Sequence, residues 1–252
     1  MKYFFISSKS KDALKAKKKY KVKYGNYKIN EADIIIPIGG DGFLLKSLHD
    51  FSKFNIPFYG INYGSIGFLM NTESKESLDE IITKAQKIQL RPLKMKATDY
   101  KGKIFQSIAF NEVSIMRQTH QAAKISIKIN NIERIKELIC DGVLVSTAAG
   151  STAYNFSAHG SIIPLESKLL ALTPISSFRP RRWRGALLTE DTKIVLTVND
   201  VRLRASSVTA DNKEIRNIKK VEISTDKKYI CDLLFNNHHS IQEKILKEQF
   251  SQ

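Results

Sequence analysis

The sequence has little cysteine and no cysteine pair at the spacing of a metal site. Cys140 and Cys231 are its 2 cysteines among 252 residues, no CxxC occurs, and no histidine lies near either of them at ligand spacing. Neither a zinc site nor a disulfide framework is indicated. We expect both thiols to be small core side chains and assign no residue to metal binding.

Long apolar runs are also absent. Only four apolar residues lie between Met1-Lys2 and Ser7, too few for the core of a signal peptide. Residues 142–165 carry no charge, but hydroxyl, amide and imidazole groups interrupt them, and hydrocarbon does not tolerate such groups. We expect a cytoplasmic protein with no membrane span and no membrane partner.

Several catalytic and nucleotide-binding motifs are missing. The 5 histidines form neither HExxH nor a triad pattern, no GK[ST] follows a glycine loop, and no GxGxxG is present. A zinc protease, a P-loop nucleotide site and a dinucleotide-binding fingerprint of the GxGxxG type are therefore not indicated.

Acidic residues are outnumbered by basic ones. Asp and Glu number 25 against 41 Lys and Arg, a net charge of +16, which suits anionic ligands from nucleotides to nucleic acid or acidic lipid. Nine lysines between Lys9 and Lys28 predict a solvated helix face. No nucleic-acid-binding motif accompanies the charge, so a nucleic-acid partner is not expected.

Four arginines crowd around Trp183: Arg179, Arg181, Arg182 and Arg184. Guanidinium groups so close together repel one another unless an anion or an acidic neighbour compensates them. The cluster therefore predicts contact with donor phosphates or with another subunit.

The first part of the chain reads as an α/β domain. Buried strands are expected at residues 3–6, 33–38 and 56–61, with helices at 12–20 and from Phe43 onward. Ser77 and Glu80 form a capping box ahead of Leu78, Ile81, Ile82, Ala85 and Ile88, which predicts a helix through Ile88 that closes the domain near residue 92. Strand, helix, strand implies a parallel sheet.

From Leu93 the apolar period changes to two, which is typical of strands. Residues 124–129 and 193–198 alternate, with a turn at Asn130-Asn131. We predict an α/β parallel-sheet domain at 1–92 and a β-rich, sandwich-like domain at 93–231. A second capping box at Ser240 and Glu243 predicts a terminal helix in a segment, 232–252, that returns to the first domain.

A phosphate-binding loop is indicated at Gly39-Gly40-Asp41-Gly42, directly after the apolar run 34–38. Backbone N–H groups of glycines after a strand approach a phosphate closely. Asp41 would repel that phosphate unless it holds a metal or takes a proton from a substrate hydroxyl. The alternative is that Asp41 only caps a helix beginning near Phe43. Lys46, one turn later, either reaches a phosphate or points into water.

Two further constellations carry polar groups where strands are expected. Asn111-Glu112 interrupts a strand-like stretch, and because successive strand residues face opposite sides, one of the two points toward a pocket or a turn. Asp141 interrupts an apolar strand, which is costly unless it is hydrogen-bonded or faces a ligand. Gly150 to Tyr154 offers small residues, hydroxyls and a ring where a strand turns into a helix, a pattern suited to a nucleotide.

These segments together resemble the NAD kinase family, which phosphorylates the 2′-hydroxyl of the adenosine ribose of NAD. The Gly39–Gly42 loop, the Asn111-Glu112 pair and the long signature from Asp141 to Tyr154 agree with it in order and spacing. The glycine-aspartate loop is shared with diacylglycerol and sphingosine kinases and resembles that of phosphofructokinases. The long signature is the specific element.

The resemblance implies a role for each matching residue. Asp41 would be the catalytic residue that orients or deprotonates the 2′-hydroxyl, with Gly42 beside it. The residues implied to bind substrate are Asn111 and Glu112 at the adenosine part, Asp141 at the nicotinamide side, Ala149, Thr152, Ala153, Tyr154, Asn155, Phe156 and Ser157 along the pocket, and Ser176 where a neighbouring subunit closes the site. The family further implies a homo-oligomer, NAD and ATP as substrates, and Mg²⁺ carried by the phosphoryl donor.

Three positions depart from the family pattern. Ala148 and Ala149 stand where a proline and a hydroxyl residue are usual, and Phe43 stands where many members carry threonine. The first two remove a hydroxyl contact and some rigidity. A lipid kinase built on the same loop is the alternative function, and a nucleic-acid-binding protein that uses the positive charge ranks third. Whether ATP, another nucleotide or polyphosphate is the donor stays open.

Overall fold

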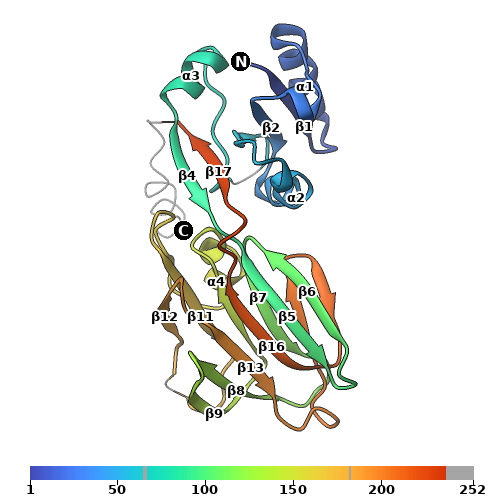
Figure 1. Ribbon diagram of the computed structural model, residues 1–252, viewed down its shortest axis with the longest axis vertical. Coiled ribbons are helices and arrows are strands. Elements are labelled where there is room, and N and C mark those ends of the chain that lie inside the picture. The colour runs from blue at the N-terminus through green and yellow to red at the C-terminus, as the bar shows by residue number, and fades with distance from the viewer. Residues whose placement is uncertain (65–66, 182, 237–252) are drawn as a thin grey trace. The chain divides into compact units, whose positions relative to one another are not determined.

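The computed structural model describes residues 1–64, 67–181 and 183–236. The chain forms two compact units, one of Met1–Leu90 with Tyr229–Gln252 and the other of Arg91–Lys228. Figure 1 labels many of the helices and strands of both units, and each unit is described by itself. The domain bounds read from the sequence stay a prediction, and the expected terminal helix at Ser240 lies outside the described residues.

Unit 1 is built on a parallel sheet in the order β1-β2-β3. Strands β1 (Tyr3–Ser7) and β2 (Ile34–Gly39) pair in parallel, and all six residues of β2 are buried. A continuous apolar run is what a strand covered on both faces requires. Strand β3 (Ile61–Asn62) is shorter than the predicted 56–61, and Phe58 forms two isolated parallel bridges, one to Ile35 and one to Leu233.

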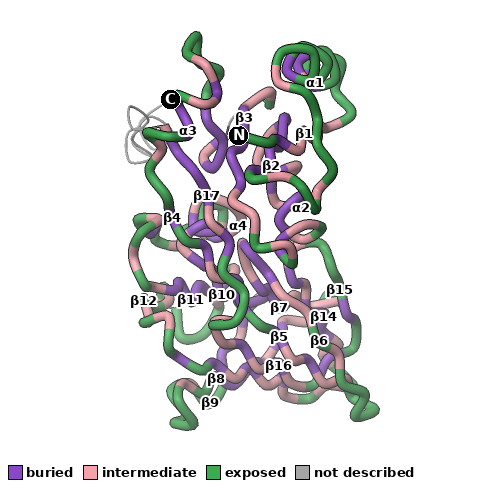
Figure 2. Tube along the Cα trace, turned by 45° about the horizontal axis from the view of Figure 1, so that its top comes forward, coloured by how far each residue is buried: buried purple, intermediate pink, exposed green. Residues whose placement is uncertain are grey.

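Two helices follow the first two strands. Helix α1 (Lys11–Tyr24) begins after Ser10, whose side chain accepts a hydrogen bond from the N–H of Ala13. It buries Ala13, Ala16 and Tyr20 and leaves most of its lysines exposed, as the green outer part of α1 in Figure 2 shows. The solvated lysine face is thus confirmed. Helix α2 (Asp41–Phe51) follows β2 and buries Leu44, Ser47 and Leu48.

The predicted helix through Ile88 is wrong at its end. The capping box of Ser77 and Glu80 forms, but helix α3 (Leu78–Lys84) stops at Lys84. Residues Gln86–Leu90 form strand β4, which pairs antiparallel with β17 (Cys231–Phe235), placing Ile88 opposite Leu233. Alternating polar and apolar residues in β4 fit a strand better than a helix. Hydrogen-bonded residues of β4 and β17, such as Lys87 and Asp232, lie 145 residues apart in the sequence, where local periodicity does not reveal the pairing. None of the helices in the described ranges is long and apolar enough to span a membrane.

Unit 2 consists of two antiparallel six-stranded sheets, which confirms the β-rich second domain. The first sheet, in spatial order, contains β12 (Ala186–Thr189), β11 (Leu169–Ile175), β10 (Gly142–Ser146), β7 (Glu112–Arg117), β14 (Ser206–Ala210) and β15 (Lys213–Ile215). The second contains β6 (Ile104–Ala109), β5 (Leu93–Asp99), β16 (Ile218–Thr225), β13 (Ile194–Val198), β8 (Ala123–Ile129) and β9 (Ile132–Cys140).

One apolar core joins the two sheets. Val113 and Val143 of the first sheet and Leu93, Ile125 and Leu196 of the second belong to a single buried cluster, as expected for a sandwich. Cys140 lies in this cluster, so its predicted role as a core side chain is confirmed. Asp141 is the single residue between β9 of one sheet and β10 of the other, so the apolar stretch around it is two strands.

Asn71 ties the strands of unit 1 together, and its replacement tests that role. The fully buried amide donates to the carbonyls of Gly60 and Leu234 at 3.1 and 2.9 Å and accepts from the N–H of Asn236 at 3.0 Å. We expect Asn71→Ala to lower the free energy of unfolding by about 2–4 kcal/mol, because buried backbone groups lose their partners. Urea unfolding measures it, with exposed Asn30→Ala as the control. A loss no larger than the control's would contradict this role.

Candidate functional site

The glycine loop of unit 1 places Asp41 at the start of a helix. Gly40 is the N-cap residue and Asp41 the first residue of α2. The Asp41 carboxylate accepts hydrogen bonds from the N–H groups of Phe68 and Leu69 at 2.7 and 3.1 Å. The capping alternative is therefore wrong: the helix begins two residues before Phe43, and the carboxylate is held toward a segment that lies 27 residues further along the chain.

A second glycine segment packs on this loop. The N–H of Tyr63 donates to the carbonyl of Gly39 at 2.7 Å, and a Cβ on Gly64 would lie 2.9 Å from the Cα of Gly40. Two backbones approach this closely only where side chains are absent. Gly42 faces open space, since nothing lies within 4 Å of a Cβ built on it. Lys46 is exposed one turn later, so its side chain is available to an anion or to solvent.

In unit 2, Asn111 and Glu112 stand at the start of β7 on a backbone held from two sides. The Asp211 carboxylate accepts from the N–H groups of Phe110, Asn111 and Glu112 at 2.7, 3.0 and 3.2 Å. The carbonyl of Asn111 in turn accepts from the N–H of Thr147 at 2.9 Å. Asp211 carries no sequence signal of its own beyond an Asp at the end of a strand, and sequence reasoning missed it.

The segment after β10 turns tightly against Asn111. Residues Ala149–Thr152 form a 3₁₀ turn and Tyr154–Ser157 the short helix α4, which confirms the expected change from strand to helix. A Cβ on Gly150 would lie only 2.3 Å from the carbonyl oxygen of Asn111. The two motifs therefore meet backbone to backbone, and only glycine fits at the contact.

Most hydroxyls of this segment hold the turn itself. Thr147 donates its Oγ1 hydrogen to the carbonyl of Phe110 at 2.6 Å and accepts from the N–H of Gly150 at 3.1 Å. Buried Ser151 donates to the carbonyl of Ala148 at 2.7 Å and accepts from the N–H of Ile163 at 3.0 Å. These side chains hold the turn through internal hydrogen bonds.

Asn155 is enclosed in the same way. It is fully buried, its amide donates to the carbonyls of Ser151 and Ser161 at 3.1 and 2.9 Å, and its Oδ1 accepts from Thr173 at 2.7 Å. Asn155 thus shapes the loop from inside. Ala149 is buried as well, whereas Thr152 and Ala153 are half-buried and Phe156 and Ser157 are exposed.

The side chain of Tyr154 lies near β7, the strand that contains Glu112 and Met116. Its hydroxyl is 3.4 Å from the Met116 sulfur. Burial, followed by the charges of Glu112 and Asp141, raises the pKa of Tyr154, so the phenol is near both carboxylates and stays protonated at neutral pH. A ring with a hydroxyl donor placed between two carboxylates suits a ligand that is aromatic at one end and polar along its length.

Asp141 is paired rather than bare. Its Oδ1 accepts from Nε of Arg117 at 2.5 Å, and both side chains are about one third exposed at 37% and 34%. Sequence reasoning missed Arg117, which sits on β7 opposite the end of β10 and carries no local motif. Ser176 follows β11, is exposed and has a left-handed backbone with φ 48°.

Glu112 is the electrostatic exception of the site. Its Oε2 is buried and has no hydrogen-bond partner within the described residues. Burial, followed by the charge of Asp211, raises the pKa of Glu112 from 4.5 to about 7. A half-protonated carboxyl with one unused oxygen at neutral pH is a ready partner for a hydroxyl or amino group of a ligand.

The arginine cluster is only partly described. Arg179 and Arg181 lie over the ring of Phe178 at 5.6 and 5.4 Å from its centroid, and Trp183 packs against the unit 2 core. Arg182 lies outside the described residues.

In the part of the chain that the structure describes, no three His, Cys, Asp or Glu side chains gather where they would hold a metal ion.

Comparisons with known proteins agree with this arrangement. Residues 5–89 match the family model of the ATP-NAD kinase N-terminal domain, and residues 110–230 match that of the ATP-NAD kinase C-terminal domain. An NAD kinase from Xylella fastidiosa (strain Temecula1 / ATCC 700964) is 49% identical over 247 residues, which are 98% of this chain and 95% of the relative.

Solved structures share the fold at lower identity. An NAD kinase from Archaeoglobus fulgidus in complex with ATP superimposes with a TM-score of 0.76 at 21% identity, covering 94% of each chain. Yeast NADH kinase complexed with NADH gives a TM-score of 0.78 at 16% identity, covering 100% of this chain and 88% of its own.

Replacing Gly150 tests the backbone contact between the two motifs. We expect Gly150→Ala to lower the free energy of unfolding by about 2–4 kcal/mol, because the added Cβ overlaps a backbone oxygen that has no room to move. Gly42→Ala, whose Cβ meets nothing within 4 Å, is the control. Equal stability of the two variants in urea would show that the contact is not as tight as described.

Glu112 makes unfolding dependent on pH. Below about pH 4.5 the carboxyl is protonated in both states; between pH 4.5 and 7 the unfolded chain releases a proton that the folded chain keeps. The stability contribution is thus fully present below the lower value and is lost as the pH rises to about 7. Relative to Glu112→Gln, we expect the loss to be on the order of 3 kcal/mol. Urea titrations from pH 4 to 8, with exposed Glu133→Gln as the control, measure it; parallel curves for wild type and Glu112→Gln would refute it.

Proposed function

The chain belongs to the NAD kinase family, and from that premise we propose how its residues carry out the reaction. It is an ATP-dependent NAD kinase, which transfers the γ-phosphoryl group of ATP to the 2′-hydroxyl of the adenosine ribose of NAD and gives NADP. The observation that carries the assignment of roles is the contact of the Asn111-Glu112 pair with the Gly150 turn, because it gathers the family's two NAD-binding motifs in one unit.

Unit 2 supplies most of the dinucleotide contacts in this proposal. Asn111 and Glu112 bind the adenosine part, where the buried, unpartnered Oε2 of Glu112 accepts from a hydroxyl or amino group. Tyr154, with Thr152 and Ala153 before it, lines the same pocket. Asp141, held by Arg117, faces the nicotinamide side. The buried Asn155 supports the pocket without presenting its amide.

Unit 1 supplies the carboxylate for the chemical step. Asp41 takes the proton of the 2′-hydroxyl, the ribose oxygen forms a bond to the γ-phosphorus, and the bond from that phosphorus to the β-phosphate oxygen breaks, which releases ADP. Hydrogen bonds from Phe68 and Leu69 fix the carboxylate. Gly42 and Lys46 approach the donor phosphates, the glycine by its open backbone and the lysine by its charge.

Mg²⁺ enters as part of the phosphoryl donor in this scheme. Bound to the donor, the ion would neutralise charge on the phosphates, as is usual for triphosphate substrates. The relatives that were solved with ATP and with NADH support a nucleotide donor and a dinucleotide acceptor.

We also propose that the enzyme acts in the cytoplasm as a homo-oligomer. The two free thiols suit a reducing compartment. In unit 2, Phe178 and Leu187 expose 51% and 50% of their surfaces, which suits a subunit contact next to Ser176. The lipid kinase alternative is not favoured, because the match extends over both family models and not over the glycine loop alone.

Asp41→Asn tests the assignment of the catalytic carboxylate. We expect the variant to fold and to turn over about 10²–10⁴ times more slowly, because an amide does not accept the hydroxyl proton. NADP formed from NAD, ATP and Mg²⁺ is measured by chromatography. Asp50→Asn, an exposed residue of the same helix, serves as the matched control and should behave like the wild type.

Each result of this experiment separates one claim from another. NADP from the wild type but little from Asp41→Asn supports both the reaction and the role of Asp41. Equal rates remove Asp41 from the role and leave the reaction. A wild-type protein that neither binds NAD nor forms NADP with any nucleotide or polyphosphate donor would overturn the proposed function.

A further inference from the structure

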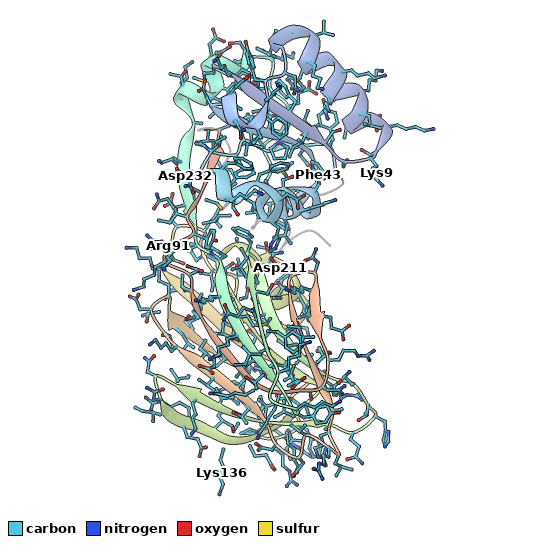
Figure 3. All side chains as sticks on the ribbon, turned by 45° about the vertical axis from the view of Figure 1, so that its right-hand side comes forward. Lys9, Phe43, Arg91, Lys136, Asp211 and Asp232 are labelled. Atoms are coloured by element: carbon cyan, nitrogen blue, oxygen red, sulfur yellow. The ribbon has the colours of Figure 1, made fainter. Side chains whose placement is uncertain are left out.

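Asp211 makes an unusual set of hydrogen bonds at the end of β14. One carboxylate accepts from three consecutive backbone N–H groups: its Oδ2 from Phe110 at 2.7 Å, and its Oδ1 from Asn111 at 3.0 Å and Glu112 at 3.2 Å. Its own N–H donates to the carbonyl of Glu112 at 3.1 Å. Figure 3 labels Asp211 and shows it at the end of unit 2 opposite Lys136. Its φ of 51° is left-handed, a conformation that Asp tolerates better than most residues.

The carbonyl side of the same three residues is also occupied. Thr147 donates its hydroxyl to the carbonyl of Phe110 at 2.6 Å and its N–H to that of Asn111 at 2.9 Å. The three backbone N–H groups from Phe110 to Glu112 therefore donate to Asp211. Their carbonyls accept from Thr147, from Asp211 and, at Asn111, also from the Ser146 hydroxyl at 3.4 Å. Such a segment has little freedom left, so its two side chains start from a fixed position.

Asp211 also acts on Glu112 through its charge. The titratable groups near Glu112 are Asp211, from the turn after β14, and Tyr154, from α4. Asp141 lies at the far end of β10 and is neutralised by Arg117. The nearby charge of Asp211 disfavours the ionised form of Glu112, and no described cation is hydrogen-bonded to Glu112 to offset it.

We propose that Asp211 is a positioning residue for the dinucleotide: its carboxylate fixes the backbone of Asn111 and Glu112 and places a negative charge beside the Glu112 carboxyl, so that both side chains meet NAD in the binding form. This inference deepens the proposed function and rests on it. Asp211 acts through these two residues and takes no part in the transfer of the phosphoryl group.

The Asp211→Asn variant removes the negative charge and keeps most of the shape of the side chain. The carboxamide still accepts through one atom, but its NH₂ group faces a backbone N–H, so one side of the clamp opens and the charge disappears. We expect the dissociation constant of NAD to rise about 10-fold to 100-fold with kcat within about threefold. We also expect the pH midpoint of the Glu112 step in urea unfolding to fall below the wild-type value, because the charge of Asp211 is the second cause, after burial, of the raised pKa of Glu112.

Two further variants complete the design. Asp211→Glu keeps the charge and moves the oxygens by one methylene, so NAD binding weakens while the pH midpoint stays near the wild-type value. Asp200→Asn replaces another left-handed aspartate, exposed and at φ 55°, and should match the wild type in both measurements. Calorimetric titration with NAD and urea unfolding between pH 4 and 8 supply the readouts.

The outcomes divide cleanly. Weaker NAD binding together with a lowered pH midpoint in Asp211→Asn supports the proposal. A folded Asp211→Asn that keeps either the wild-type affinity or the wild-type midpoint overturns it, since a merely structural role would change stability alone. If that variant does not fold, wild-type affinity in Asp211→Glu overturns the proposal. A wild type that binds no NAD defeats the proposed function instead, and the pH midpoint still reports the coupling of Asp211 to Glu112.

Discussion

The contact between the backbone of Asn111 and the turn at Gly150 is the constraint on which the binding part of unit 2 depends. A Cβ at position 150 would fall 2.3 Å from a carbonyl oxygen, so the chain reaches Asn111 only because that side chain is missing. The approach lets Thr147 bond the carbonyls of Phe110 and Asn111. It also brings α4, and with it Tyr154, over β7. The arrangement of these residues therefore depends on the missing side chain at Gly150.

The polar residues in this region are of two kinds: most form hydrogen bonds inside the protein, and Glu112 does not. Thr147, Ser151 and Asn155 look like ligand-binding groups in the sequence, yet their side chains bond backbone carbonyls or N–H groups inside the protein. Buried polar atoms need partners, and these residues find them internally. Glu112 does not: one of its oxygens is buried without a partner. This contrast separates Glu112 from the other polar residues of the segment.

Short-range sequence patterns predicted the strands and turns that depend on neighbouring residues. The apolar run 34–38 and the alternation at 124–129 gave β2 and β8, and the two asparagines at 130 and 131 form the turn with positive φ that the hairpin needs. Ile88 was misplaced in a helix because its partner, Leu233, comes from far along the chain. Asp211 escaped notice for the same reason, since its partners lie 99 to 101 residues before it. Polar residues in strand-like and glycine-rich stretches, such as Asp41, Glu112 and Asp141, could be singled out from the sequence pattern, whereas their individual roles came from the resemblance to a family and stay predictions.

The free-energy cost of burying the Glu112 carboxyl argues for a ligand-binding role more directly than the position of Glu112 does. A buried carboxyl beside a second carboxylate weakens the folded state whenever it ionises. A glutamine of the same size would avoid that cost while filling the same space. The side chains of Thr147, Ser151 and Asn155 all find hydrogen-bond partners inside the protein. The missing partner is therefore a property of the Glu112 position. Marginally stable groups of this kind collect where a ligand supplies the missing donor. NAD, with ribose hydroxyls and an amino group on adenine, carries such donors, and binding would then supply the hydrogen bond that the buried Oε2 of Glu112 does not find inside the protein.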